Sequence, residues 1–355
     1  MAAPTMKALR LYAVGDLRLE EMPRPEPGPG QARIKVAFCG VCGSDIPRCF
    51  EKGTYHFPTV CGHEFAGTVD AVGPDTTGIT PGMRVAVFPL IWCGTCPACE
   101  QGQYAQCFDY DYLGSRSDGA FAEYVVAPVQ NLLPVPEGVA LEEAAMTEPA
   151  SVALHALRRG GGASVGETVA VFGAGPIGLI VAQWARACGA THVVLFDIDP
   201  QKLALAGTLG FTQAFDVRAN DPVATINELT GGKGAHVCIE AAGVPVTMCQ
   251  AIACARWNGR VVLMGNPSAD VTLPAKLISQ AMRREIALLG TWNSVYSATG
   301  NDDDWRTALD AMAAGRLALA PLITHTVPLD QATGALEMMR DRSSFSAKVL
   351  IAPAH

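Results

Sequence analysis

The sequence predicts an α/β protein of two domains, one rich in β-strands and one built on a doubly wound parallel sheet. Three observations support this fold class. The chain has 355 residues, enough for two domains that each bury a core. Residues 7–38 alternate short apolar runs with prolines and glycines, as strands and turns do. From Thr168 onward, apolar strands alternate with helical stretches, which is typical of βαβ units.

The first of these units contains a glycine-rich turn. A buried strand at 169–172 leads directly into Gly173, Gly175 and Gly178, and the next strand ends at Asp197. Such glycines permit a tight turn, a close approach of backbone N–H groups to a pyrophosphate, and close packing of helix against strand. The carboxylate of Asp197 can accept hydrogen bonds from both ribose hydroxyls, whereas a 2′-phosphate about 4 Å away would cost roughly 4 kcal/mol per charge pair. The unit therefore predicts a dinucleotide site that prefers NAD to NADP.

The same alternation continues after this unit. Further strands are expected at 214–217, 236–240, 260–265 and 286–292, with helices at 200–209, 223–229 and 245–255. Six parallel strands with helices between them form a Rossmann fold, which binds its ligand at the carboxyl ends of the strands. The candidate coenzyme contacts lie in the glycine turn, near the end of the second strand and at the later strand ends: Gly173, Gly175, Pro176, Ile177, Gly178, Asp197, Lys202, Ala242, Gly243, Gly265, Asn266, Thr291 and Trp292. Residues 302–340 are expected to be helical and mixed.

The composition excludes several classes of function. With 49% hydrophobic and 17% charged residues, the chain is globular and not disordered. Its net charge of −8 gives no attraction to nucleic acid or to an anionic membrane. The apolar run at 169–187 could suggest a membrane span, but glycines and polar residues interrupt it. Because the N-terminus lacks the apolar core of a signal peptide, we expect a cytoplasmic protein.

Cysteine spacing indicates a closed metal site. Twelve cysteines in a reducing compartment favour metal binding over disulfides. Within the lobe at about 90–110, four thiols separated by two, two and seven residues can surround one tetrahedral zinc ion: Cys93, Cys96, Cys99 and Cys107. The alternative is an iron–sulfur cluster, but its bacterial pattern places the last cysteine after three residues and before a proline. A closed zinc site stabilises the fold without doing chemistry.

A second set of residues indicates an open metal site. Cys42 and His63 lie in a glycine-rich region, and a thiolate with an imidazole supplies two of the three protein ligands of a catalytic zinc. Glu148 is the best candidate for the third ligand, and Glu64 beside His63 is the alternative. Asp45 is expected to hold the His63 ring by a hydrogen bond rather than to bind the metal.

Together these motifs resemble a known family. Cys-Gly-Ser-Asp at 42–45, Gly-His-Glu at 62–64, the four-cysteine lobe, Glu-Pro at 148–149 and the glycine turn, in this order, resemble the zinc-dependent medium-chain dehydrogenases. The glutamate at 148, in place of a third cysteine, resembles the polyol branch that includes sorbitol dehydrogenase. The stretches 42–50 and 111–124 are similar to galactitol-1-phosphate 5-dehydrogenases.

The resemblance implies a particular domain organisation. A GroES-like β-rich catalytic domain would comprise residues 1–149 and 290–355, and a Rossmann NAD-binding domain would comprise 150–289. It also implies a homodimer or homotetramer joined through edge strands of the cofactor sheets.

The resemblance also assigns roles to single residues. Cys42, His63 and Glu148 would bind the catalytic zinc, with Glu64 adjacent and able to exchange into the shell. Ser44 would relay the alcohol proton. Many relatives have a histidine where this chain has Pro47, so the outer relay would run through water, His56 or Glu148. Arg48 and Arg116 could contact a substrate phosphate, because guanidinium groups match phosphate oxygens.

The sequence therefore predicts an NAD-dependent enzyme with two zinc ions per chain. It would oxidise a secondary hydroxyl of a sugar alcohol, with or without a phosphate, to a ketose. Threonine or a simple secondary alcohol is the alternative substrate. A metal-free reductase of the same fold is disfavoured by the Cys42, His63 and Glu148 set. A non-catalytic zinc-binding module would leave the dinucleotide unit unexplained.

Overall fold

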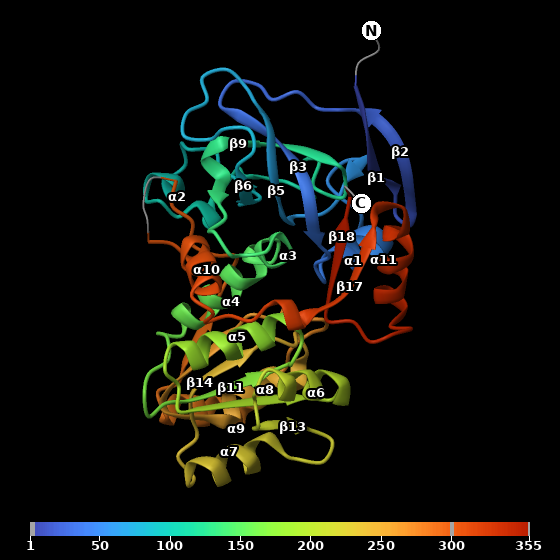
Figure 1. Ribbon diagram of the computed structural model, residues 1–355. Coiled ribbons are helices and arrows are strands. Elements are labelled where there is room, and N and C mark those ends of the chain that lie inside the picture. Colours follow the sequence, from blue (N-terminus) through green and yellow to red (C-terminus); the bar gives the residue numbers. More distant parts are fainter. Residues whose placement is uncertain (1–3, 299–301, 354–355) are drawn as a thin grey trace. The chain divides into compact units, whose positions relative to one another are not determined.

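A computed structural model describes residues 4–298 and 302–353, and its internal contacts divide the chain into two units (Figure 1). The first unit comprises Met1–Glu148, Val295–Ala314 and Ile323–His355, and the second comprises Pro149–Ser294 and Gly315–Leu322. Residues 290–294 and 315–322, which the sequence analysis assigned to the first domain, belong with the second unit. The side chain of Gln183 donates to the Ala318 carbonyl and accepts from the Ala318 N–H, which ties the second of these segments to its unit.

The first unit consists mainly of antiparallel strands. Its larger sheet has the order β10-β6-β5-β3-β18-β17, with β9 paired to β3. A three-stranded sheet has the order β2-β1-β4, and β7 pairs with β8. The strands are β1 (Thr5–Ala13), β2 (Asp16–Pro23), β3 (Gln31–Gly40), β4 (Thr59–Val60), β5 (Glu64–Val72), β6 (Arg84–Val87), β7 (Leu90–Ile91), β8 (Asp111–Tyr112), β9 (Tyr124–Pro128), β10 (Leu132–Pro134), β17 (Ile323–Pro328) and β18 (Lys348–Ala352).

The core of the first unit fixes the register that builds the site. Ile34, Val36, Phe65 and Val69 of the central strands are buried in one apolar cluster. In the antiparallel pair of β3 and β5, Gly40 lies opposite Glu64. The residues just after β3 and just before β5 are therefore neighbours, although more than twenty positions separate them in the sequence. The helices of this unit are short, apart from α10 (Asp304–Ala313) and α11 (Ala332–Asp341).

The second unit contains the doubly wound sheet that the sequence predicts. Its six strands have the order β13-β12-β11-β14-β15-β16, and each neighbouring pair is parallel. They are β11 (Thr168–Phe172), β12 (His192–Asp197), β13 (Ala214–Asp216), β14 (Ala235–Glu240), β15 (Ala255–Leu263) and β16 (Ala287–Gly290). The helices are α4 (Thr147–Arg159), which begins in the first unit, α5 (Pro176–Ala187), α6 (Pro200–Thr208), α7 (Pro222–Thr230), α8 (Pro245–Cys254) and α9 (Ala275–Arg283).

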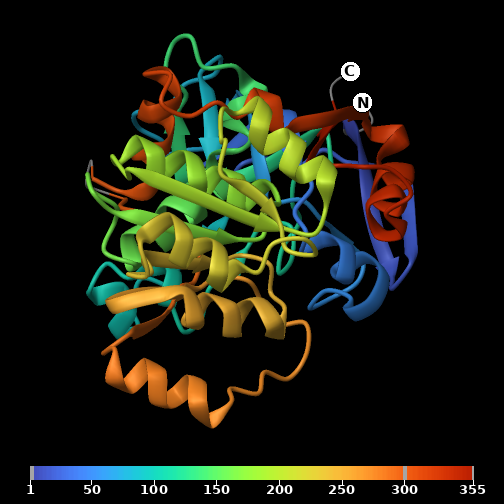
Figure 2. The same ribbon diagram turned by 90° about the horizontal axis from the view of Figure 1, so that it is seen from below.

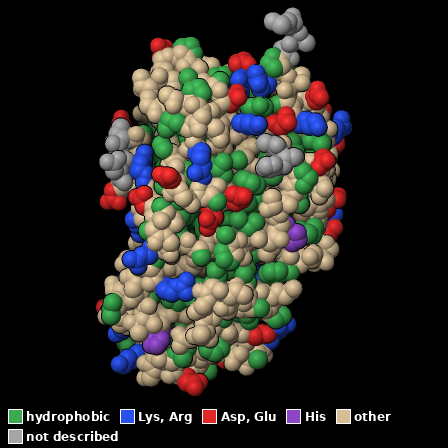
Figure 3. All heavy atoms as spheres, in the orientation of Figure 1, with side chains coloured by type: hydrophobic (Ala, Val, Ile, Leu, Met, Phe, Trp, Pro, Cys, Tyr) green, Lys and Arg blue, Asp and Glu red, His purple; other side chains and the backbone are tan. Residues whose placement is uncertain are grey.

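Helices cover both faces of this sheet (Figures 1 and 2). Phe172 and Phe196 point to the face that α7, α8 and α9 cover, in a cluster with Ile226 and Leu277. Because side chains alternate along a strand, Val171 points to the opposite face, where α5 packs. No helix among the described residues is long and apolar enough to cross a bilayer. On the face drawn in Figure 3, acidic and basic side chains are interspersed.

Candidate metal centres and coenzyme turn

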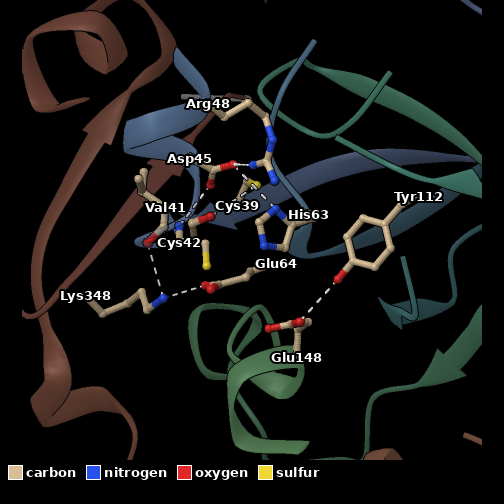
Figure 4. Close-up of polar contacts among 11 residues, drawn as sticks. Cys39, Val41, Cys42, Asp45, Arg48, His63, Glu64, Tyr112, Glu148 and Lys348 are labelled. Carbon is tan, nitrogen blue, oxygen red and sulfur yellow. Dashed lines mark hydrogen bonds and ion pairs between the residues drawn. The ribbon is translucent and has the colours of Figure 1, made fainter. Parts of the chain in front are cut away.

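The end of β3 and the start of β5 bring three metal-binding side chains together. The sulfur of Cys42, a ring nitrogen of His63 and a carboxylate oxygen of Glu64 all lie within 4.8 Å of one another (Figure 4). His63 and Glu64 are buried, and Cys42 is partly exposed. Thiol, imidazole and carboxylate are the donor types of an open zinc site, so this group can hold a metal ion.

Asp45 organises this group from the short helix α1 (Asp45–Pro47). Its carboxylate is completely buried, accepts from the Cys42 N–H at 3.0 Å and lies 3.5 Å from Nδ1 of His63. Arg48 donates to the same carboxylate. Burial acts to raise the pKa of Asp45, but His63 and Arg48 outweigh it and the pKa is lowered. An ionised Asp45 this close to Nδ1 favours Nε2 of His63 as the metal-binding atom.

Glu64 has a buried cationic partner from the far end of the chain. Nζ of Lys348, at the start of β18, donates to Glu64 at 2.5 Å and to the Val41 carbonyl at 3.3 Å (Figure 4). Burial acts to lower the pKa of Lys348, yet the charge of Glu64 overcomes it and the pKa is raised. The ammonium group therefore neutralises one of the acidic charges beside Cys42. Lys348 belongs to none of the motifs that the sequence displays.

Glu148 faces the same group from the first turn of α4 (Figure 4). Its carboxylate is buried and accepts from the Tyr112 hydroxyl at 3.3 Å. Burial raises the pKa of Glu148 to about 7, against the opposing effect of His63. The ring of Tyr112 also meets the His63 ring edge-on at 5.7 Å. Two glutamates thus border the open site, and only Glu64 has an ion-pair partner among the described residues.

The four-cysteine lobe has the geometry of a closed zinc site. The sulfurs of Cys96 and Cys99 are 3.5 Å apart, those of Cys96 and Cys107 are 3.9 Å apart, and those of Cys93 and Cys99 are 4.0 Å apart. Four sulfurs at 2.3 Å from a tetrahedral ion would be about 3.8 Å from one another. A disulfide would require about 2.05 Å, and all twelve cysteines are free.

Backbone N–H groups prepare two of these thiols for deprotonation. The N–H of Thr95 lowers the pKa of Cys93 to about 6, and that of Phe108 lowers the pKa of Cys96. Burial raises the pKa of Cys99 to about 12 and also that of Cys107. Cys93 and Cys96 therefore ionise more readily than Cys99 and Cys107, and a bound cation would favour the thiolate form of all four.

The glycine turn between β11 and α5 requires glycine for steric reasons. Gly173 has φ of 102°, and a Cβ there would lie 2.9 Å from the Ala242 nitrogen. A Cβ on Gly178 would lie 1.8 Å from the Gly173 carbonyl oxygen, so no side chain can replace it. A Cβ on Gly175 would meet nothing within 4 Å, which leaves open space at the N-terminus of α5. A helix N-terminus with such space can receive a phosphate group.

Asp197 lies beside this turn at the end of β12. Its carboxylate accepts from the N–H groups of Ala174 at 2.7 Å, Ile198 at 2.7 Å and Asp199 at 2.9 Å. Nζ of Lys202 lies 3.7 Å away. These contacts hold the Asp197 side chain at the C-terminal ends of the parallel strands, where the ribose of the coenzyme is expected to bind.

The loops that follow β14 and β15 approach one another closely. A Cβ on Gly265 would lie 2.2 Å from the Gly243 nitrogen, so the loops after β14 and β15 touch through their backbones. The buried Glu240 accepts from the N–H groups of Ala242 and Gly243. Asn266, Thr291 and Trp292 line a cavity of about 380 Å³ within this unit. Glu240 belongs to none of the motifs that the sequence displays.

The remaining predicted residues lie in the first unit. Ser44 is exposed at the N-terminus of α1. The His56 ring has both nitrogens engaged, by Thr59 and by the Arg116 carbonyl. The guanidinium of Arg48 is committed to Asp45, whereas that of Arg116 lies between two tyrosine rings.

Comparison with known proteins identifies relatives over the full chain. The alcohol dehydrogenase GroES-like domain matches residues 28–137, and the zinc-binding dehydrogenase family matches residues 176–320. The chain is 36% identical over 352 residues to galactitol 1-phosphate 5-dehydrogenase of Escherichia coli (strain K12), covering 98% of this chain and 100% of that protein. It is 31% identical over 354 residues to sorbitol dehydrogenase of Bacillus subtilis (strain 168), covering 98% of this chain and 97% of that protein.

Solved structures confirm the fold class. Galactitol-1-phosphate dehydrogenase from Escherichia coli superposes with a TM-score of 0.91 at 35% identity, covering 98% of this chain and 100% of that one. A zinc-binding dehydrogenase from Sinorhizobium meliloti 1021, bound to NADP, superposes with a TM-score of 0.89 at 32% identity, covering 99% and 100%. The GroES-like and Rossmann folds expected from the sequence are therefore both present.

Proposed function

Because the chain belongs to the zinc-binding medium-chain dehydrogenases, we propose that it oxidises a secondary hydroxyl of a sugar alcohol to a ketone with NAD. One observation carries this proposal: Cys42 and His63 meet at a buried site that two glutamates border. The reaction balances when the carbon gives a hydride to NAD and the hydroxyl gives up a proton.

In this proposal Cys42, His63 and Glu148 hold the catalytic zinc. Lys348 supports this choice between the glutamates, because it already neutralises Glu64 and anchors it at 2.5 Å. Glu148 is buried without a cation of its own, and a metal ion would favour its ionised form. Glu64 remains adjacent as the reserve carboxylate. The second zinc ion of the chain would occupy the lobe of Cys93, Cys96, Cys99 and Cys107.

The chain's own residues position the reacting groups. When bound, zinc lowers the pKa of a hydroxyl that it coordinates, and NAD accepts a hydride. Ser44, exposed beside Cys42, is the group that takes the substrate proton. Pro47 cannot pass that proton onward, so it leaves through water or through His56. The carboxylate of Asp45, 3.5 Å from Nδ1 of His63, favours one orientation of the ring by its charge.

The preference for NAD rests on Asp197. Its carboxylate is fixed by three backbone N–H groups and cannot turn away from a ribose phosphate without losing them. We expect Asp197→Ala to lower the ratio of kcat/KM for NAD over NADP by roughly 100-fold or more, since a charge pair costs about 4 kcal/mol. Kinetics with both coenzymes measure this ratio. If it stays constant, another group, with Lys202 the nearest candidate, distinguishes the coenzymes.

A homodimer or homotetramer completes the proposal. β16 is an edge strand of the parallel sheet, and Leu288, Trp292 and Met282 near it are exposed apolar side chains. Unpaired edge groups beside apolar side chains favour pairing with another copy of the chain.

Initial rates with NAD against hexitols, pentitols, their phosphates, L-threonine and 2-butanol test the proposed function. We expect turnover with a polyol or a polyol phosphate and loss of it on removal of zinc. Turnover confined to L-threonine or 2-butanol would replace the polyol assignment. Failure of every substrate with both coenzymes would contradict it.

A further inference from the structure

Arg116 is held in a clamp made of two loops of the first unit. The carbon centre of its guanidinium lies 4.3 Å from the centre of the Tyr55 ring and 4.3 Å from that of the Tyr110 ring. Both distances are within the range of cation–π contacts. Nε2 of His56 donates to the Arg116 carbonyl at 2.8 Å, which joins the loop of Tyr55 to the loop of Tyr110. The guanidinium is thus fixed in place before any ligand arrives.

The clamp supplies no negative charge to Arg116. Arg33 pairs with Asp70 and Glu26, and Arg48 pairs with Asp45. Among the described residues, no carboxylate oxygen lies within 4.0 Å of the Arg116 guanidinium, which donates to the Tyr55 hydroxyl at 3.5 Å. Its Nε atom is buried and has no hydrogen-bond partner. An ordered, partly desolvated guanidinium without an anion is prepared to bind one.

A cavity of about 520 Å³ opens beside Arg116. Its wall includes Tyr55, Trp92, Tyr110, Asp109 and Asp111. Ring contacts connect this wall to the open metal site. Tyr110 meets Tyr112 at 6.4 Å, and Tyr112 contacts both His63 and Glu148. Tyr112 therefore links the wall of this cavity to the border of the metal site, and the wall itself also includes Cys93 of the closed lobe.

We infer that Arg116, clamped between Tyr55 and Tyr110, binds the phosphate of a phosphorylated polyol and so sets the enzyme's preference for phosphorylated over neutral substrates. This inference rests on the proposed function. The cavity wall supports a ligand that carries both an anion and hydroxyl groups. Asp109 and Asp111 repel a wholly anionic ligand but accept hydrogen bonds from hydroxyls, and a neutral polyol would leave Arg116 unpaired.

Arg116 is preferred over Arg48 for this role. Arg48 donates to the buried Asp45, so a phosphate there would compete with an existing ion pair and disturb the carboxylate that lies 3.5 Å from His63. Removing a partner from a buried, ion-paired carboxylate is costly. Arg116 can bind an anion without breaking any ion pair.

The test measures turnover and equilibrium binding for Arg116→Ala, Arg116→Lys and the wild type. The substrates are galactitol 1-phosphate and galactitol. Titration calorimetry of galactitol 1-phosphate and of galactitol, each without NAD, gives the two affinities. We expect Arg116→Ala to reduce the ratio of kcat/KM for the phosphorylated over the neutral substrate by roughly 10- to 100-fold, as loss of a charge-assisted hydrogen bond does. Arg116→Lys keeps the charge but not the planar fork and should recover part of the ratio.

Arg218→Ala, which removes an exposed ion pair of the second unit, is the matched control and should leave the ratio unchanged.

The outcomes separate the inference from the proposed function. If Arg116→Ala binds galactitol 1-phosphate at least 10-fold more weakly than the wild type does, while its affinity for galactitol is unchanged, the inference stands whatever the turnover. If Arg116→Ala binds both ligands as the wild type does, or loses affinity for both equally, the inference is wrong even when polyols are oxidised. Absence of turnover with every polyol, together with Arg116-dependent binding, would instead contradict the proposed function alone.

Discussion

The first unit contains two groups of metal-binding side chains that are assembled in opposite ways. The four-cysteine lobe comes from one short segment, 93–107, and its sulfurs are 3.5 to 4.0 Å apart. The open site takes Cys42 and the adjacent pair His63 and Glu64 from separate segments, is bordered by Glu148, and adds Lys348 from the last strand. The lobe offers four like donors and leaves no position free, whereas the open site mixes donors and adds titratable carboxylates. Metal ligands that come from one short segment suit a site that stabilises the fold. Ligands that come from distant segments suit a site that carries out a reaction.

Removal of a ligand from the open site should abolish turnover but spare the fold. Cys42→Ser replaces a thiolate with a weak ligand, so we expect loss of one zinc ion per chain and a fall in kcat of about 1000-fold or more. Such a fall corresponds to about 4 kcal/mol of transition-state stabilisation. Metal analysis and steady-state rates measure the two effects, and circular dichroism measures the fold.

The matched control for Cys42→Ser is Cys188→Ser, an exposed cysteine of the second unit. It should keep both metal ions and the full rate. If Cys42→Ser retained the wild-type rate with one zinc ion per chain, Cys42 would not be a ligand of the catalytic metal.

Removal of a ligand from the closed lobe should have the reverse effect. Cys99→Ser leaves three thiols around the ion, and we expect destabilisation of about 4 kcal/mol or more, the size associated with loss of a structural metal. The rate per folded molecule should change little. Thermal unfolding followed with and without a chelator measures the stability. A variant with wild-type stability but reduced kcat would show that the lobe takes part in catalysis.

Much of the fold could be predicted because its signals are local. The turn at Gly173 to Gly178 needs glycine for contacts that lie within a few residues, and α5 and β12 follow where the spacing placed them. The helix α9 was not expected, although its apolar residues recur at helical spacing, because it is only 9 residues long and buries only Leu277. The strand β17 lies in a region expected to be mixed, and only its pairing with β18 defines it.

The site could be predicted only as far as its motifs extend. Cys42 and His63 belong to short patterns, and the register of β3 with β5 brings them together. Lys348 is 284 residues from Glu64, and their contact depends on β18 lying beside β3. A lysine at the start of an otherwise apolar closing strand was the available signal. Nothing in the spacing of Tyr55, Tyr110 and Arg116 indicated that they would stack.

The two sites should also differ in how pH affects the metal-free protein. Burial raises the pKa of Glu148 to about 7, whereas an ordinary glutamate in the unfolded chain has a pKa of 4.5. Between these values the folded state holds a proton that the unfolded state has released. Stability is therefore lost as pH rises from about 4.5 to about 7, by up to about 3 kcal/mol.

Glu148→Gln tests this expectation because it keeps the shape of the side chain and removes its titration. In chelator-treated samples, the unfolding midpoint of the wild type should fall relative to that of the variant as pH rises from 4.5 to 7. With zinc bound, the unfolding midpoints of the two proteins should depend on pH in the same way, because the ion favours the ionised carboxylate of Glu148. Parallel midpoints for the two proteins across this range would mean that Glu148 ionises freely in the folded chain. The open site would then lack the desolvated carboxylate that distinguishes it from the closed lobe.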